Sequence, residues 1–100
     1  MFSYIRPYIF NINPEAAHNL AIKSLKYNFL PEKLFTVENE EILNLNLFGR
    51  SIKNPIGLAA GFDKNAEVVN PMFNLGFGFV EVGTITPKSQ FGNSKPRVFR

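Results

Sequence analysis

The chain contains no cysteine, no tryptophan and a single histidine among its 100 residues. Without cysteine it can form neither disulfides nor thiolate metal sites. One histidine and no cluster of acids leave no metal site to predict. The most apolar stretch, residues 1–12, is shorter than the roughly twenty residues that span a bilayer. It also lacks the basic start and the small-residue cleavage site of a secretory signal.

Charge points to no particular partner. The net charge of +3 and the isoelectric point near 9.4 come from dispersed basic residues. No nucleic-acid recognition module is visible, so we expect no nucleic-acid partner. One acid-free run near the end of the chain contains Lys88, Lys95, Arg97 and Arg100. This run is either a solvated loop or a rim that faces an anionic surface or a cofactor phosphate.

The first 26 residues predict two helices. Residues 1–12 are almost wholly apolar or aromatic. Asn13 and Pro14 form a favourable start for the second helix, because the Asn side chain caps free N–H groups and proline needs none at the first helical position. Glu15 lies at the positive end of the helix dipole. The expected apolar face comprises Ala17, Leu20, Ala21, Ser24 and Leu25, with Lys23 and Lys26 outside it.

Two interpretations of this helical segment remain open. An aromatic helix before a basic amphipathic one is typical of a segment that lies in the membrane interface. Alternatively, both helices simply pack on the rest of the protein, and the pattern alone favours packing.

A linker and a hairpin follow. Residues 31–41 are polar and acidic and are interpreted as a linker. Leu alternates with Asn over residues 42–48, which predicts a half-buried strand. Gly49-Arg50 would form a turn and residues 51–53 a return strand. We expect this hairpin to cap the amino-terminal, non-catalytic end of a barrel.

The next stretch carries the strongest functional signal. Residues 56–60 predict a strand buried on both faces, and it ends in Ala59, Ala60 and Gly61. A flat ring or a phosphate can approach the backbone N–H groups of such small residues. Asp63 and Lys64 add charge at the carboxyl end of the strand, where barrel enzymes place their chemistry. The alternative is that the small residues allow tight packing and that the charged pair is solvated.

A helix over residues 67–75 and a second strand over residues 79–85 complete a β-α-β unit. Thr84 and Thr86 come at the carboxyl end of the second strand, so both strand ends would offer polar groups to one crevice. The glycines do not fit the dinucleotide fingerprint, since its third glycine would fall at Glu81. The pattern therefore favours a barrel over a Rossmann fold.

Three ordered motifs closely resemble class 2 dihydroorotate dehydrogenases, which are flavin enzymes that pass electrons to membrane quinone. They are residues 54–65 (NPIGLAAGFDKN), 75–87 (LGFGFVEVGTITP) and 92–100 (GNSKPRVFR). Residues 13–18 (NPEAAH) also resemble the amino-terminal segment peculiar to this class. The chain departs from the usual pattern at Ala66, where glycine is common, and at Pro71, which would start or kink the first barrel helix.

The resemblance implies an α/β fold, namely the amino-terminal portion of a (β/α)8 TIM barrel preceded by a small helical membrane-associated segment. Residues 1–36 would form this segment around a quinone tunnel, and residues 37–53 the linker and the hairpin. Residues 54–100 would be the first β-α-β unit of an FMN-binding barrel. A complete barrel needs about 250 residues, so we expect the 100 residues to be an amino-terminal fragment that is inactive alone.

The resemblance also implies site residues. FMN would contact Ala60, Gly61, Phe62, Asp63, Lys64 and Thr84. The ammonium of Lys64 would stabilise the negative charge that appears on the flavin on reduction, and would reach the carboxylate of dihydroorotate. His18 and Arg100 match positions that offer hydrogen bonds to a quinone carbonyl. The catalytic base of this class is a serine further along, so the chain holds no catalytic residue that we can name.

The expected function is oxidation of dihydroorotate to orotate in de novo pyrimidine biosynthesis, with FMN as cofactor and membrane quinone as electron acceptor. The expected place is the cytoplasmic face of the cell inner membrane. Two alternatives stay open: a different FMN-dependent barrel oxidoreductase, and a non-enzymatic membrane-surface fragment.

Overall fold

The computed structural model describes residues 2–29, 38 and 40–99. Its elements run in the order α1 (Phe2–Phe10), α2 (Pro14–Lys26), a 3-10 helix η2 (Glu41–Leu43), β1 (Leu45–Leu47), β2 (Arg50–Ile52), β3 (Gly57–Leu58), α3 (Val69–Asn74) and β4 (Phe79–Val80). The predicted linker over residues 31–41 lies almost wholly outside the described residues. The order of elements matches the predicted pair of helices, hairpin and β-α-β unit.

Local chemistry explains where α2 begins. The Oδ1 atom of Asn13 accepts hydrogen bonds from the backbone N–H groups of Glu15 (2.9 Å) and Ala16 (3.3 Å), and Pro14 occupies the first turn. These bonds satisfy donors that a helix leaves free at its start. Helix α1 precedes this cap and has no buried residue. No helix in the described part of the chain is long and apolar enough to cross a membrane.

The hairpin has a shorter first strand than predicted, and its turn, Phe48-Gly49, and its return strand lie one residue earlier than predicted. Leu45 to Leu47 pairs antiparallel with Arg50 to Ile52, and the turn between them places Phe48 and Gly49 at positive φ. The predicted strand over residues 42–48 was wrong at its start, because Glu41–Leu43 forms a 3-10 turn instead. In this register Leu43 would face Asn54, where the chain has already turned toward β3. The start of the predicted strand therefore has no partner to pair with.

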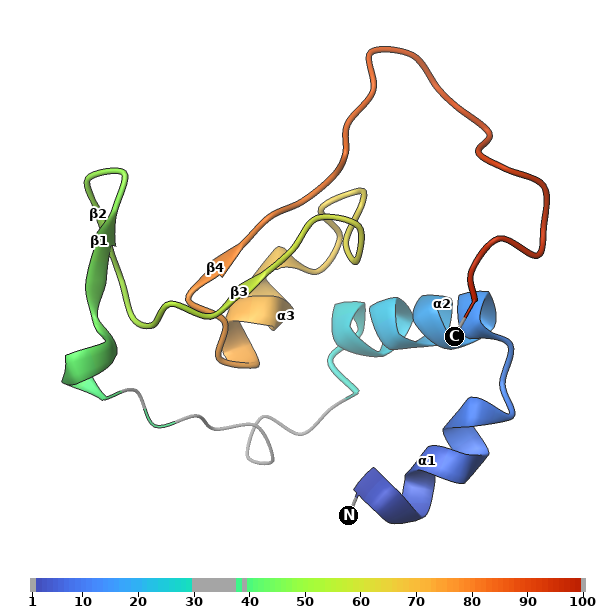
Figure 1. The fold of residues 1–100 in the computed structure, drawn as a ribbon, viewed down its shortest axis with the longest axis horizontal. Helices are drawn as coiled ribbons and strands as arrows, with labels where there is room; N and C mark the ends of the chain where they lie inside the picture. The colour runs from blue at the N-terminus through green and yellow to red at the C-terminus, as the bar shows by residue number, and fades with distance from the viewer. Residues whose placement is uncertain (1, 30–37, 39, 100) are drawn as a thin grey trace.

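Strands β3 and β4 are parallel, with α3 between them in the sequence (Figure 1). The regular strands are shorter than the predicted residues 56–60 and 79–85, but pairing continues on both sides of them. The N–H of Gly78 donates to the carbonyl of Ile56 (2.8 Å), and that of Glu81 to Leu58 (2.9 Å). Gly78 allows this approach because a Cβ there would collide with the backbone carbonyl of Asn54.

A small apolar core joins α2 to the β-α-β unit. Its buried side chains are Leu25 from α2, and Val68 and Met72 at and within α3. Partly buried side chains surround them, namely Ile22, Leu58, Phe62, Leu75, Phe77 and Val80. The predicted apolar face of α2 was wrong at Leu20, which is 56% exposed. Ile22 takes its place because α3 packs against the adjacent side of the helix.

The arrangement gives the β-α-β unit two distinct ends. The hairpin lies on the side where β3 begins, whereas β3 and β4 run toward the side where α2 lies (Figure 1). After β4 the chain passes in a long arc and returns to the start of α2 (Figure 1). The described residues form no closed barrel. Helix α2 and the returning arc therefore both lie at the carboxyl side of the strands, where the predicted site residues are.

Candidate functional site

The turn after β3 leaves its small residues open. Ala59, Ala60 and Gly61 are all exposed. Gly61 has a φ of +108°, which disfavours any other residue, and a Cβ built on it would meet nothing within 4 Å. The backbone at the end of β3 is therefore bare and approachable. This geometry fits the close approach of a flat ring that the sequence predicted for these residues.

The segment after β4 lies directly against this turn. The N–H of Gly61 donates to the carbonyl of Gly83 (3.0 Å), and the N–H of Gly83 donates to the carbonyl of Asp63 (3.3 Å). Thr84, the next residue, is exposed beside them. The structure thus brings the two predicted strand ends together. Thr86 differs, because its hydroxyl donates to the carbonyl of Lys88 (2.6 Å) in its own loop.

Asp63 is held inside the turn. Its carboxylate accepts hydrogen bonds from the N–H of Glu67 at Oδ1 (2.8 Å) and from the N–H of Val68 at Oδ2 (2.9 Å), and the residue is only 2% exposed. Both oxygens are thereby used just before α3. The side chain of Asp63 shapes the turn, and its predicted contact with a cofactor stays a prediction.

Lys64 presents an uncompensated positive charge at the same turn. It is exposed, and it has no ion-pair partner among the described residues. Lys26 and Lys95, by contrast, are each paired with a glutamate. An exposed ammonium at this turn suits an electron-rich or anionic ligand. The donor set at this turn therefore fits FMN and a carboxylate substrate.

His18 reaches this turn from α2. Its ring meets the ring of Phe62 edge to face, with the two centroids 5.1 Å apart. Both residues are half-buried. The structure therefore joins one residue that the resemblance assigns to quinone with one that it assigns to FMN. Arg100, the other residue predicted for the quinone site, lies outside the described residues.

Ion pairs hold α2 near both of its ends. Glu15 binds Arg97 (Oε1 to Nη2, 3.1 Å) and Lys95 (Oε1 to Nζ, 3.4 Å), and Lys26 binds Glu67 (Nζ to Oε2, 2.8 Å). Partial burial raises the pKa of Glu15, but the hydrogen bonds and charges of Arg97 and Lys95 outweigh it and hold this pKa below its ordinary value. The hydrogen bond and charge of Glu67 raise the pKa of Lys26.

These ion pairs were missed at the level of sequence. Glu15 was interpreted only as a charge at the helix dipole, and Lys95 and Arg97 as a solvated loop or an anion-facing rim. The structure gives the two cations a partner that neither interpretation anticipated. No local pattern could have found it, because Glu15 and Arg97 are 82 positions apart.

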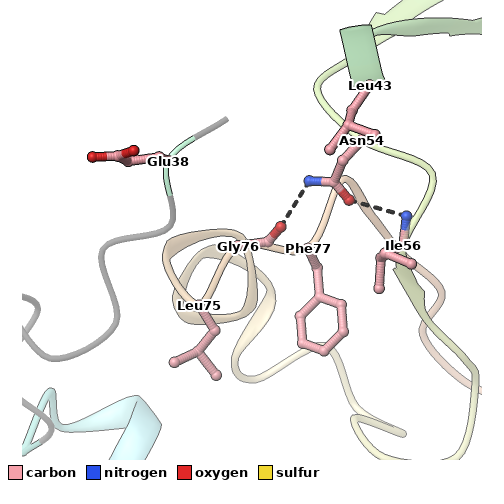
Figure 2. Close-up of a pocket in the computed structure, with 7 residues that line it drawn as sticks. All are labelled: Glu38, Leu43, Asn54, Ile56, Leu75, Gly76 and Phe77. Atoms are coloured by element: carbon pink, nitrogen blue, oxygen red, sulfur yellow. Dashed lines mark hydrogen bonds between the residues drawn. The ribbon is translucent and has the colours of Figure 1, made fainter. Parts of the chain in front are cut away.

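A pocket of about 280 Å³ lies away from the predicted site. It is lined by Glu38, Leu43, Asn54, Ile56, Leu75, Gly76 and Phe77. Figure 2 shows how Asn54 organises it: the side-chain NH2 donates to the carbonyl of Gly76 (2.9 Å), and Oδ1 accepts from the N–H of Ile56 (3.0 Å). The amide is therefore used to fix the start of β3, and none of the predicted site residues lines this pocket.

Known proteins that are similar to this chain are dihydroorotate dehydrogenases. The family described as dihydroorotate dehydrogenase matches residues 42–100. A dihydroorotate dehydrogenase (quinone) of Agrobacterium fabrum is 48% identical over 101 residues, covering 100% of this chain and 27% of the relative. The mitochondrial dihydroorotate dehydrogenase (quinone) of Mus musculus is 46% identical over 89 residues, covering 89% of this chain and 22% of the relative. The chain thus spans about a quarter of the length of these curated relatives.

Solved structures agree on the fold. The crystal structure of the Eimeria tenella DHODH in complex with ferulenol matches with a TM-score of 0.78 and 49% identity, covering 87% of this chain and 23% of that chain. The ligand-free Eimeria tenella enzyme matches with a TM-score of 0.77. These matches confirm the predicted fold class, part of an α/β barrel preceded by helices. Because the family match spans the hairpin, the turn after β3 and the segment after β4, the chain belongs to the dihydroorotate dehydrogenase family.

Proposed function

We propose that the protein oxidises dihydroorotate to orotate in de novo pyrimidine biosynthesis, with FMN as cofactor and membrane quinone as electron acceptor. The contact between His18 and Phe62 carries this proposal, since it places α2 against the turn at the end of β3. A flavin enzyme that passes electrons to quinone needs its quinone site and its flavin site to lie close together. Relatives named dihydroorotate dehydrogenase (quinone) match residues on both sides of this contact.

The cofactor would lie on the bare backbone of the β3 turn. Ala60, Gly61 and Thr84 would hold it through backbone and hydroxyl groups, with Phe62 and Asp63 shaping the turn beneath. When bound, FMN supplies two-electron chemistry, accepting electrons from dihydroorotate and releasing them to quinone. Lys64 would place its ammonium where negative charge develops, and would orient the substrate carboxylate. The catalytic base is not among the residues that we can name here.

The acceptor side would be formed by α1 and α2. His18 would donate a hydrogen bond to a quinone carbonyl, and Arg100 would do the same. The aromatic surface of α1, including Tyr4 and Tyr8, is exposed and of the kind that enters a membrane interface. We place the protein on the cytoplasmic face of the cell inner membrane, attached through this surface.

A two-stage spectroscopic titration of the full-length enzyme tests the proposal. Under anaerobic conditions, dihydroorotate should bleach the flavin absorbance at one equivalent per site. A long-chain quinone in detergent micelles should then restore it. A different FMN-dependent barrel enzyme would bind flavin but would not be bleached by dihydroorotate. A protein without flavin absorbance would contradict the proposal outright.

A further inference from the structure

We propose that Glu15 is a positioning residue: its carboxylate clasps Arg97 and Lys95 and thereby fixes the first turns of α2 beside the carboxyl ends of β3 and β4. The clasp would keep the acceptor side of the protein assembled, so its loss would selectively impair turnover with a long-chain quinone. The expected effect on quinone turnover rests on the proposed function, whereas the clasp itself does not.

The donors of Arg97 and Lys95 converge on the carboxylate of Glu15. The Oε1 atom accepts from Arg97 Nε (3.3 Å) and Nη2 (3.1 Å), and Lys95 Nζ lies 3.4 Å away. The third guanidinium nitrogen, Nη1, donates to the carbonyl of Phe91 (2.9 Å). Arg97 is thus anchored on its own loop and points its remaining donors at α2, which lowers the entropy lost on forming the clasp.

Burial separates this contact from an ordinary surface ion pair. The side chains of Glu15 and Arg97 are 19% and 34% exposed, whereas Lys26 and Glu67 in the pair at the other end of α2 are 47% and 37% exposed. Lys95, at 69%, is the exposed member of the clasp. Exposed pairs contribute little, because water and salt screen them. The two ion pairs on the same helix therefore differ in exposure, so the pair of Lys26 and Glu67 can serve as the control for the clasp.

The position of Glu15 on α2 shows why it matters. The buried residue of α2 is Leu25, ten positions further along and therefore about 15 Å from Glu15 along the axis. Apolar packing consequently holds the carboxyl-terminal half of the helix. The amino-terminal half is held by the ring contact between His18 and Phe62 and by the clasp. Because His18 is one turn from Glu15 on the same face, releasing the clasp frees the ring as well.

The test compares Glu15→Gln with Lys26→Gln in the full-length enzyme. Both remove one charge from α2, but only the first breaks the clasp. Glu15→Gln should speed amide hydrogen exchange in residues 17–22 by about fivefold or more, the lower range of coupling between contacting groups. Exchange in α3 should stay unchanged, and Lys26→Gln should change neither segment. Arg97→Gln should speed the same exchange to a smaller extent, because Lys95 still pairs with Glu15, and adding Arg97→Gln to Glu15→Gln should give no further increase.

Steady-state kinetics test whether the clasp supports turnover with a long-chain quinone. Glu15→Gln should raise the KM for a long-chain quinone about fivefold or more, without changing turnover with a small soluble dye. Unchanged exchange in residues 17–22 would overturn the clasp, whatever the activity. Faster exchange with an unchanged KM would overturn its link to the acceptor. An enzyme that does not oxidise dihydroorotate would refute the proposed function, and the exchange measurement would still decide the clasp.

Discussion

At the scale of single residues, Lys64 is the residue for which we proposed an electrostatic role. It is exposed at the β3 turn and has no ion-pair partner in the described part of the chain. We expect Lys64→Ala in the full-length enzyme to slow reduction of the flavin by dihydroorotate about 100-fold or more, the scale for removing one electrostatic stabiliser. Reoxidation by quinone should slow far less. Stopped-flow absorbance in the flavin band measures both half-reactions.

Lys53→Ala is the matched control for this measurement. Lys53 is also exposed, but it follows the hairpin and lies before β3 begins, at the other end of the strands. Its removal should leave both half-reactions unchanged. If Lys64→Ala retains FMN and is reduced at the parent rate, the role assigned to this ammonium is wrong.

Asp63 makes a different kind of contribution, through the shape of the turn. Asp63→Ala would leave the N–H groups of Glu67 and Val68 without their acceptor, and Val68 is fully buried. An unsatisfied buried donor such as the Val68 N–H is costly, so we expect the full-length enzyme to lose about 1–3 kcal/mol of unfolding free energy. The midpoint of urea unfolding measures this. Asp63→Asn keeps one acceptor and should lose less; equal losses would contradict this account.

At the scale of elements, α1 can be separated from α2. Deleting residues 1–30 would uncover Val68 and Met72, which pack against Leu25. Deleting residues 2–12 removes α1 alone, which has no buried residue. We expect this shorter deletion to retain FMN and its reduction by dihydroorotate. Flotation with liposomes and turnover with a long-chain quinone should be lost, because the deletion removes the apolar surface that would bind the membrane interface. Each Å² of apolar surface buried there contributes about 25 cal/mol to binding.

A small soluble dye provides the internal control for the deletion, since it needs no membrane and should still accept electrons. If the shortened enzyme floats with liposomes and reduces long-chain quinone at the parent rate, α1 is only a packing helix.

Elements set by local chemistry were predictable from sequence, and those set by a partner were not. The start of α2 follows from Asn13 and Pro14, whose cap and fixed φ act within one turn. The exposed position of Leu20 could not be predicted, because the side of α2 that is buried depends on where α3 lies. Strand length likewise depends on the neighbouring strand. The partners of Glu15 carried no local signal at all.

At the scale of the whole molecule, burial is sparse. The buried apolar side chains among the described residues are Leu25, Val68 and Met72. So small a core cannot offset the conformational entropy of ordering such a chain. We expect residues 1–100 alone to bind no stoichiometric FMN and to show no cooperative thermal transition. Flavin absorbance after reconstitution and a circular-dichroism melt measure these two properties, and a yellow monomer that unfolds cooperatively would refute the expectation.

The clasp between Glu15 and Arg97 also has a consequence for the order of events during synthesis. The two residues are 82 positions apart, and a ribosome adds about 5–20 residues per second. Arg97 therefore emerges roughly 4–16 seconds after Glu15, by the same elongation rate. Throughout that interval α2 lacks the cation that holds its first turn, and the aromatic surface of α1 is already outside the ribosome. The nascent helices thus have time to meet a membrane or a chaperone before the clasp can form.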